Sequence, residues 1–254
     1  MIRVGVLGAA GRVGSAVCRA VADDPDLELV AAVDPHHAGS AVAGITISAD
    51  RQALVDAHAE VAVDFTRADA ARDNILWAAA QGIHMVVGTT GFADDDYRRF
   101  GAAFTSTGCF IAPNFAIGAV LMMRFAELAA PYFDSAEIVE LHHDRKRDAP
   151  SGTAMLTAER MAAASGDWGD DPTDHEVIAG ARGGRGPGGI RVHSVRLRGL
   201  VAHQEVVLGT DGQSLTIRHD SYDVGSFMPG VVLAVKAVAD RPGLTVGLDQ
   251  LFDL

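Results

Sequence analysis

The chain has 254 residues, of which 48% are hydrophobic, and a formal net charge of -12. This length fits one large or two modest domains with real cores, and the acidic balance disfavours nucleic-acid binding because phosphates would be repelled. The two cysteines are too few for a disulfide framework, no apolar run reaches the roughly 20 residues of a membrane span, and no signal sequence precedes the first strand, so we expect a cytoplasmic protein.

The first half of the chain alternates apolar, valine-rich runs with segments of helical spacing. The expected strands span 2–7, 27–33, 61–63, 85–87 and 110–112, and the expected helices span 12–22, 68–80 and 94–104. Strands that alternate with helices form a parallel sheet covered on both faces. We therefore predict an α/β, Rossmann-type doubly wound sheet.

The pattern changes after an apolar helix expected at 117–130. Strands follow at 137–142, 192–197, 202–208 and 214–218, with a tight hairpin at Asp211-Gly212, and a final helix covers 227–239. This half is predicted to be an α+β domain with a mixed or antiparallel sheet that has too few helices to cover it, so we expect self-association. The predicted domains are 1–116 with 226–254 for dinucleotide binding, and 117–225 for substrate binding and oligomerisation.

A glycine-rich turn joins the first strand to the first helix, with the spacing Gly8-x-x-Gly11-x-x-Gly14. Such glycines let the backbone approach a pyrophosphate at a helix start, and Asp34, 20 residues after Gly14 at the end of the second strand, is placed to bind the ribose hydroxyls. Asp34 would repel a 2′-phosphate, whereas Arg12 could pair with one. We expect NADH to be favoured and NADPH to be tolerated.

Two more loops follow later strands at the carboxyl edge, where open α/β sheets bind ligands. They are Gly88-Thr89-Thr90 and Ala112-Pro113-Asn114-Phe115. Their small side chains and hydroxyls suit a nicotinamide riboside. Each loop taken alone fits ordinary turn chemistry equally well.

The segment from His142 to Thr153 concentrates groups suited to acid–base chemistry on an anionic ligand. Lys146 and Lys236 are the only lysines beside 19 arginines (21 minus 2), and a lysine can release its proton where an arginine cannot. Ser151 is the expected N-cap of a helix whose first amides, at Gly152 and Thr153, would bind a carboxylate. A metal site is a poorer interpretation because adjacent histidines are not the usual ligand spacing.

These motifs resemble the family of 4-hydroxy-tetrahydrodipicolinate reductase, also called dihydrodipicolinate reductase. The resemblance covers essentially the whole chain, through the segments 8–14, 86–92, 111–118, 140–154 and 226–230. It implies the lysine and diaminopimelate pathway, in which a nicotinamide cofactor reduces the unsaturated ring of a cyclic dicarboxylate. It also implies a homotetramer built through the second domain.

The resemblance also assigns roles to positions of this chain. His142 matches the acid/base histidine and Lys146 the proton-donating lysine, and the positions that bind the substrate carboxylates are His143, Gly152 and Thr153. The cofactor positions are Gly8, Ala9, Ala10, Gly11, Arg12, Val13, Asp34, Gly88, Thr89, Thr90, Ala112, Pro113, Asn114 and Phe115. Ala10 departs from the family, because many members carry a basic residue there, which leaves Arg12 alone to meet a 2′-phosphate.

Two other functions stay open on the sequence. One is another two-domain NAD-dependent dehydrogenase acting on a small carboxylate. The other is a non-enzymatic NADH sensor, which gives no reason for a lysine beside two histidines. Turnover of the cyclic dicarboxylate separates both from the reductase.

Overall fold

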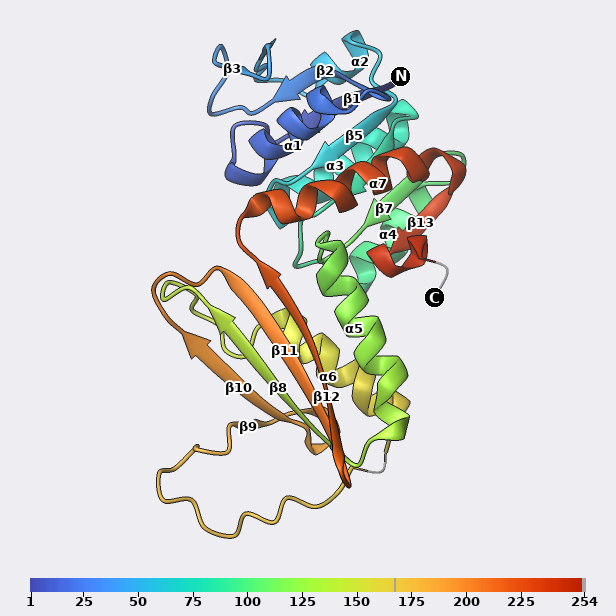
Figure 1. Cartoon of the computed structure of the whole chain (residues 1–254). Coiled ribbons are helices and arrows are strands. Elements are labelled where there is room, and N and C mark those ends of the chain that lie inside the picture. The colour runs from blue at the N-terminus through green and yellow to red at the C-terminus, as the bar shows by residue number, and fades with distance from the viewer. Residues whose placement is uncertain (167, 253–254) are drawn as a thin grey trace. The chain divides into compact units, whose positions relative to one another are not determined.

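The structure is a computed structural model that describes residues 1–166 and 168–252 (Figure 1). The chain forms two compact units. Within the described residues, the first comprises Met1–Ile117 together with residues 224–252, and the second comprises Gly118–Asp223. Within the described ranges, no helix is long and apolar enough to cross a membrane.

The first unit is built on a six-stranded sheet in the order β13-β7-β6-β5-β1-β2, and its strand pairs are parallel. The strands are β1 (Ile2–Leu7), β2 (Leu27–Val33), β5 (Val61–Asp64), β6 (His84–Val87), β7 (Gly108–Ile111) and β13 (Gly243–Val246). β5 and β7 are buried along their whole length, as expected for strands covered on both faces. The predicted doubly wound parallel sheet is confirmed.

Helices cover both faces of this sheet. They are α1 (Arg12–Asp23), α2 (Gln52–Asp56), α3 (Ala68–Gln81), α4 (Asp94–Ala103) and α7 (Met228–Ala237). α1 packs with α7 and α3 packs with α4, and the two pairs lie on opposite sides of the strands (Figure 1). Ile75 of α3 and Phe100 of α4 are buried against Ala62 and Met85 of the sheet. This core holds the carboxyl ends of the strands in fixed positions.

The second unit contains a five-stranded mixed sheet in the order β12-β11-β8-β10-β9. The strands are β8 (Ser135–His142), β9 (Gly184–Arg185), β10 (Arg191–Arg196), β11 (Ala202–Thr210) and β12 (Gln213–Ser221), and the helices are α5 (Ile117–Ala129) and α6 (Gly152–Ala164). β8 and β10 run parallel, whereas the other pairs are antiparallel. The predicted mixed sheet is therefore confirmed.

The predicted hairpin joins β11 to β12 through Gly212, whose φ of +77° is accessible to glycine at little cost. The elements that the sequence did not reveal are short. They are α2, β9, β13 and the hairpin of β3 (Ala41–Val42) with β4 (Ile45–Thr46). Runs of two to five residues are too brief to show a periodic pattern, so only tertiary contacts define them.

Candidate active site

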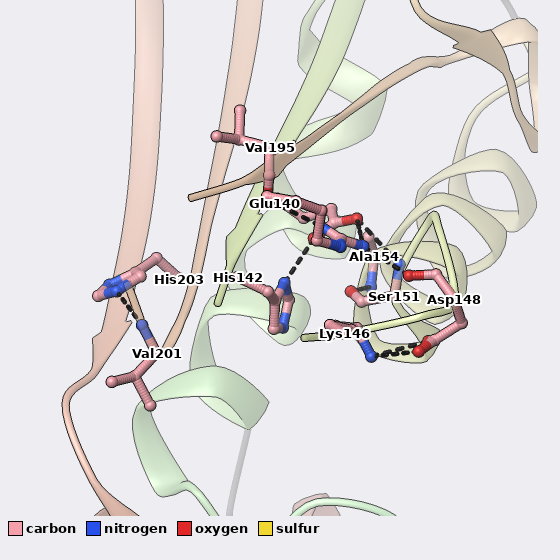
Figure 2. A network of polar contacts seen from close by, with 10 residues as sticks. Glu140, His142, Lys146, Asp148, Ser151, Ala154, Val195, Val201 and His203 are labelled. Carbon is pink, nitrogen blue, oxygen red and sulfur yellow. Dashed lines mark hydrogen bonds and ion pairs between the residues drawn. The ribbon is translucent and has the colours of Figure 1, made fainter. Parts of the chain in front are cut away.

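The predicted acid–base segment runs from the end of β8 to the start of α6 (Figure 2). Glu140 and His142 share one face of β8 because side chains two residues apart on a strand point the same way. α6 packs against β8 and begins at Gly152, after the N-cap Ser151. The structure thus gathers His142, Lys146 and Ser151 at one end of the sheet.

Glu140 lies at the centre of this group with a fully buried side chain. Arg196 donates from both Nη atoms to the two carboxylate oxygens, at 2.8 and 2.7 Å, and the amide of Ser151 donates to Oε1 at 3.2 Å. Burial raises the pKa of Glu140, but the hydrogen bonds from Arg196, Ser194 and His142 outweigh it and hold the pKa below its ordinary value. The carboxylate is therefore ionised at neutral pH.

His142 contacts this carboxylate through its Nδ1, 2.5 Å from Oε2 of Glu140. Because an ionised carboxylate only accepts, Nδ1 carries the proton and Nε2 of the neutral ring is an acceptor. Burial lowers the pKa of His142, Glu140 opposes this, and the charges of Lys146 and Arg196 add to the lowering, so the net shift is downward. A neutral ring with a defined tautomer suits transient acceptance and release of a proton at Nε2.

Lys146 is held by Asp148, whose two carboxylate oxygens lie 2.9 and 2.7 Å from Nζ. The lysine side chain is 20% exposed, whereas that of Asp148 is 62% exposed, so the ammonium sits at the boundary between the interior and water. Its charge lowers the pKa of His142. Of the two lysines, only this one lies beside the histidine, since Lys236 pairs with Asp24 and Asp26 in the other unit.

The start of α6 has the features expected of a carboxylate site. The Ser151 hydroxyl accepts the amide of Ala154 at 3.2 Å, and the amides of Gly152 and Thr153 precede that capped group in the first turn, at the positive end of the helix. A side chain at Gly152 would meet only open space, so the glycine leaves the approach clear. His143 is half-buried just after β8, and its Nδ1 accepts the amide of Arg145 at 3.2 Å.

In the first unit, the glycine turn brings the backbone of α1 tightly against β1. Gly8 has a φ of +78°, and a Cβ added to Gly14 would lie 2.0 Å from the carbonyl oxygen of Gly8, so no other residue fits there. The amides of Gly8 and Ala9 donate to the carbonyl oxygen of Val33, at 2.9 and 3.0 Å. The amides left for an anion are those of the first helical turn, beginning at Arg12 and Val13.

Asp34, which follows β2, is buried, with 9% of its surface exposed. Its Oδ1 accepts the amide of His36 at 3.1 Å and lies 3.0 Å from Nδ1 of His37, and the amide of Ala10 also bonds to the carboxylate. Burial raises the pKa of Asp34, but the hydrogen bonds from His37 and His36 outweigh this effect, so the net shift of the pKa is downward. Arg12 is exposed near this turn.

The other two predicted loops follow β6 and β7. Thr89 is buried, and its hydroxyl donates to Asp64 and to the carbonyl of Thr66, both at 3.2 Å, so this side chain stabilises the loop. A Cβ on Gly88 would lie 2.0 Å from the ring of Phe65, a close approach that requires glycine. Phe65 also contacts the ring of Phe115, with centroids 5.8 Å apart.

The remaining members of these loops differ in exposure. Thr90 and Pro113 are exposed, Asn114 is half-buried and Ala112 is fully buried. The Asn114 side chain accepts the amide of Ala116 at 2.9 Å, which fixes the turn that leads into α5. The loop after β7 therefore has a defined backbone conformation.

Sequence reasoning missed the residues that hold the site together. Glu140 could have been found from its spacing of two from His142, which puts both on one strand face. Arg196, Asp148 and His37 left no local signal, because each meets its partner through the tertiary fold or an irregular loop. Among the described residues, no group of three or more histidine, cysteine or acidic side chains is arranged to hold a metal ion.

The first unit has a parallel sheet with a glycine turn, and the second has a histidine and a lysine beside the start of a helix. This combination is typical of two-domain NAD(P)-dependent oxidoreductases. The family model described as dihydrodipicolinate reductase, N-terminus, matches residues 2–115, and the one described as dihydrodipicolinate reductase, C-terminus, matches residues 118–252. The chain belongs to the dihydrodipicolinate reductase family.

Relatives and solved structures agree with this assignment. The chain is 52% identical over 259 residues to 4-hydroxy-tetrahydrodipicolinate reductase of Cutibacterium acnes, covering 100% of both chains. It is 54% identical over 260 residues to the protein of the same name from Nocardia farcinica, covering 100% of this chain and 99% of that one. A dipicolinate-bound dihydrodipicolinate reductase from Paenisporosarcina sp. TG-14 matches with a TM-score of 0.91 and 38% identity, over 99% of this chain and 100% of that chain.

More distant structures share only the fold. Amine dehydrogenase from Mycobacterium smegmatis matches with a TM-score of 0.68 at 16% identity, over 98% of this chain and 95% of that chain. The fold alone therefore does not distinguish the reductase from other dehydrogenases.

Proposed function

We propose that the chain reduces 4-hydroxy-tetrahydrodipicolinate to tetrahydrodipicolinate with NAD(P)H, a cytoplasmic step of lysine and diaminopimelate biosynthesis. The observation that carries this proposal is the full-length match to reductases of that name, at 52% and 54% identity. The relative solved with dipicolinate supports a cyclic dicarboxylate as substrate. Turnover of this substrate, once measured, would also exclude the two alternatives, another small-carboxylate dehydrogenase and an NADH sensor.

We assign the substrate to the end of β8 and the start of α6. The amides of Gly152 and Thr153, the Thr153 hydroxyl and His143 would bind the two carboxylates, which need donors in a chain of net charge -12. Lys146 supplies the proton from Nζ, and Nε2 of His142 accepts and relays protons beside it. Fixing both carboxylates orients the ring toward these two groups.

The first unit fits a dinucleotide, because the close contact of Gly14 with Gly8 is the tight turn that a pyrophosphate site requires. The positions we assign to the cofactor are those from Gly8 to Val13, Asp34, Gly88 to Thr90 and Ala112 to Phe115. Bound NAD(P)H supplies the hydride. We propose that NADH is favoured, since a second ionised group beside the Asp34 carboxylate would be repelled.

We further propose that the second unit forms a homotetramer through its sheet. α6 covers the face that carries Ile138, which is fully buried. On the opposite face the neighbouring apolar side chains of Val139, Val195 and Val207 are only partly buried. Such a face is stabilised by a second copy of the chain. Analytical ultracentrifugation tests this, and a monomer at micromolar concentration would refute it.

The test of the activity is oxidation of NADH and NADPH, side by side, with substrate freshly generated by the preceding pathway enzyme. We expect turnover with both cofactors and a higher kcat/KM for NADH. Binding of NADH without turnover would instead support the sensor. Turnover only with a different small carboxylate would support another dehydrogenase.

A further inference from the structure

We propose that Glu140 is the positioning residue of the site, and that Arg196 keeps it ionised. In this arrangement Glu140 fixes the tautomer of His142 and sets the pH at which that ring titrates. This inference deepens the proposed function and rests on it. Neither residue belongs to the predicted set of catalytic and binding positions.

The carboxylate of Glu140 must carry its charge in the interior. Glu140 has a fully buried side chain, and burying a lone carboxylate is too costly to be tolerated. Arg196 removes this cost with a bidentate contact to both oxygens, at 2.8 and 2.7 Å, from a side chain that is 19% exposed. A guanidinium stays protonated at any physiological pH, so this partner cannot be lost by titration.

The charge of Glu140 acts on His142 through a direct contact. Nδ1 lies 2.5 Å from Oε2 of Glu140, so the ring must donate there and present Nε2 as its other polar atom. Among the described residues, the charged groups that most affect the pKa of the ring are Glu140, Lys146 and Arg196, and of these three Glu140 alone favours the protonated ring. Loss of its charge therefore shifts the titration of His142 to lower pH.

Glu140 and Arg196 also hold the loop that follows β8 and the start of α6. Oε1 of Glu140 accepts the amide of Ser151, the N-cap of α6, at 3.2 Å. Arg196 donates from Nη2 to the carbonyl oxygen of Asp148 at 2.6 Å, and the side chain of Asp148 pairs with Lys146. The carboxylate of Glu140 and the guanidinium of Arg196 thus contact both ends of the segment that carries the proposed proton donor.

The chain offers a matched control on the same strand. Glu137 contacts Arg182 at 2.6 Å and Nε2 of His193 at 2.8 Å, so it repeats the same three residue types. It lies an odd number of residues from Glu140, so it points to the opposite face of β8, away from His142. Glu137→Gln removes an equivalent charge without touching the acid–base group. Because Glu137 is paired with Val207 on the face proposed to contact other copies, ultracentrifugation checks that this variant keeps its oligomeric state.

The experiment measures kcat/KM for the substrate and NADH against pH in the wild type, Glu140→Gln and Glu137→Gln. The part of the pH profile that reports the titration of His142, here called the His142 limb, is identified by its absence in His142→Asn. We expect its midpoint to move to lower pH by about one unit in Glu140→Gln and to stay in place in Glu137→Gln. An unmoved limb in Glu140→Gln would overturn the proposal.

Two more variants separate the positioning of His142 by Glu140 from a general loss of order in the site. Ser151→Ala removes the helix cap but leaves Glu140 on His142, so we expect weaker inhibition by pyridine-2,6-dicarboxylate with the His142 limb unmoved. If Glu140→Gln does not fold, Glu140→Gln with Arg196→Gln gives a neutral pair. A smaller downward shift than in Glu140→Gln is expected there, because loss of Arg196 also removes a charge that lowers the pKa of His142. A midpoint at the wild-type pH would count against the inference.

A readout independent of turnover distinguishes this inference from the proposed function. The ring nitrogen shifts of His142, assigned by comparison with His142→Asn, report its tautomer and its titration midpoint directly. A wild type without turnover would refute the proposed activity, while these shifts would still test the link to Glu140. We expect a protonated Nδ1 in the neutral wild-type ring, and a protonated Nε2 would refute the positioning role.

Discussion

Strand β8 carries two clusters made of the same three residue types, on opposite faces of one sheet. Glu137 with Arg182 and His193 forms one, and Glu140 with Arg196 and His142 forms the other. The side chain of Glu137 is 36% exposed, whereas that of Glu140 is fully buried. Because water screens the first cluster more than the second, the same residue types have different consequences.

This difference shows that residue type and spacing do not decide which cluster does chemistry. In the Glu137 cluster the side chains are 25–36% exposed, so water partly screens its ion pairs. In the buried one the charges act on one another, so each protonation state depends on its neighbours. Burial by α6 therefore makes His142, rather than His193, the candidate acid–base group.

The largest expected effect concerns stability. Glu140→Ala leaves Arg196 without its partner in the interior, so we expect a loss of about 3–5 kcal/mol in the free energy of unfolding. Glu137→Ala should cost less, because its side chain is 36% exposed and water partly screens its ion pairs. Urea unfolding followed by circular dichroism measures both. Equal losses would show that the two clusters do not differ in burial as described.

The second prediction extends the comparison to the two lysines. Lys146→Ala should lower kcat by about 100-fold, equivalent to about 2.7 kcal/mol, because the proton donor is lost, while the affinity for NADH stays unchanged. Lys236→Ala, which removes the lysine that pairs with Asp24 and Asp26, is the control and should keep kcat. Steady-state kinetics and NADH fluorescence titration check both, and wild-type kcat in Lys146→Ala would remove the lysine from the mechanism.

The third prediction tests another carboxylate beside a histidine, the pair of Asp34 and His37. Asp34→Ala should weaken NADH binding by about 10-fold through loss of charged hydrogen bonds to the ribose, and should weaken NADPH binding less. His37→Ala keeps the carboxylate and serves as the control. Calorimetric titration with both cofactors gives the ratio, and equal weakening would show that Asp34 does not bind the ribose.

The smallest expected effect is the pH dependence of stability. The pKa of His142 is lowered below its ordinary 6.5, chiefly by burial, so its contribution is complete above 6.5 and is lost as the pH falls through the lowered value. His142→Asn should therefore flatten the decline of Tm between about pH 7 and about pH 5, an effect worth less than about 1 kcal/mol. The exposed His175 is the control, and His175→Asn should keep the wild-type slope.

Much of the fold was predictable because its elements are long and periodic. β1 and β2 begin and end where their apolar runs do, and the Asp211-Gly212 hairpin follows from turn chemistry. Elements such as α2 and β13 were not predictable, since pairing with neighbours defines them rather than their own sequence pattern. The elements around the candidate site were therefore expected, but the edge strand β13 of the first sheet was not.

The local sequence determined that a histidine, a lysine and a helix start lie within one short segment, and that a glycine turn precedes α1. Only the tertiary structure determined that Arg196, on a strand far along the chain, meets Glu140, and that Asp34 turns to His37 and Ala10. The physical reason is that the charge state of a buried group depends on what surrounds it, and those surroundings come from segments distant in sequence. Sequence spacing can bring residues together on one face, but packing decides whether water or another charge is their neighbour.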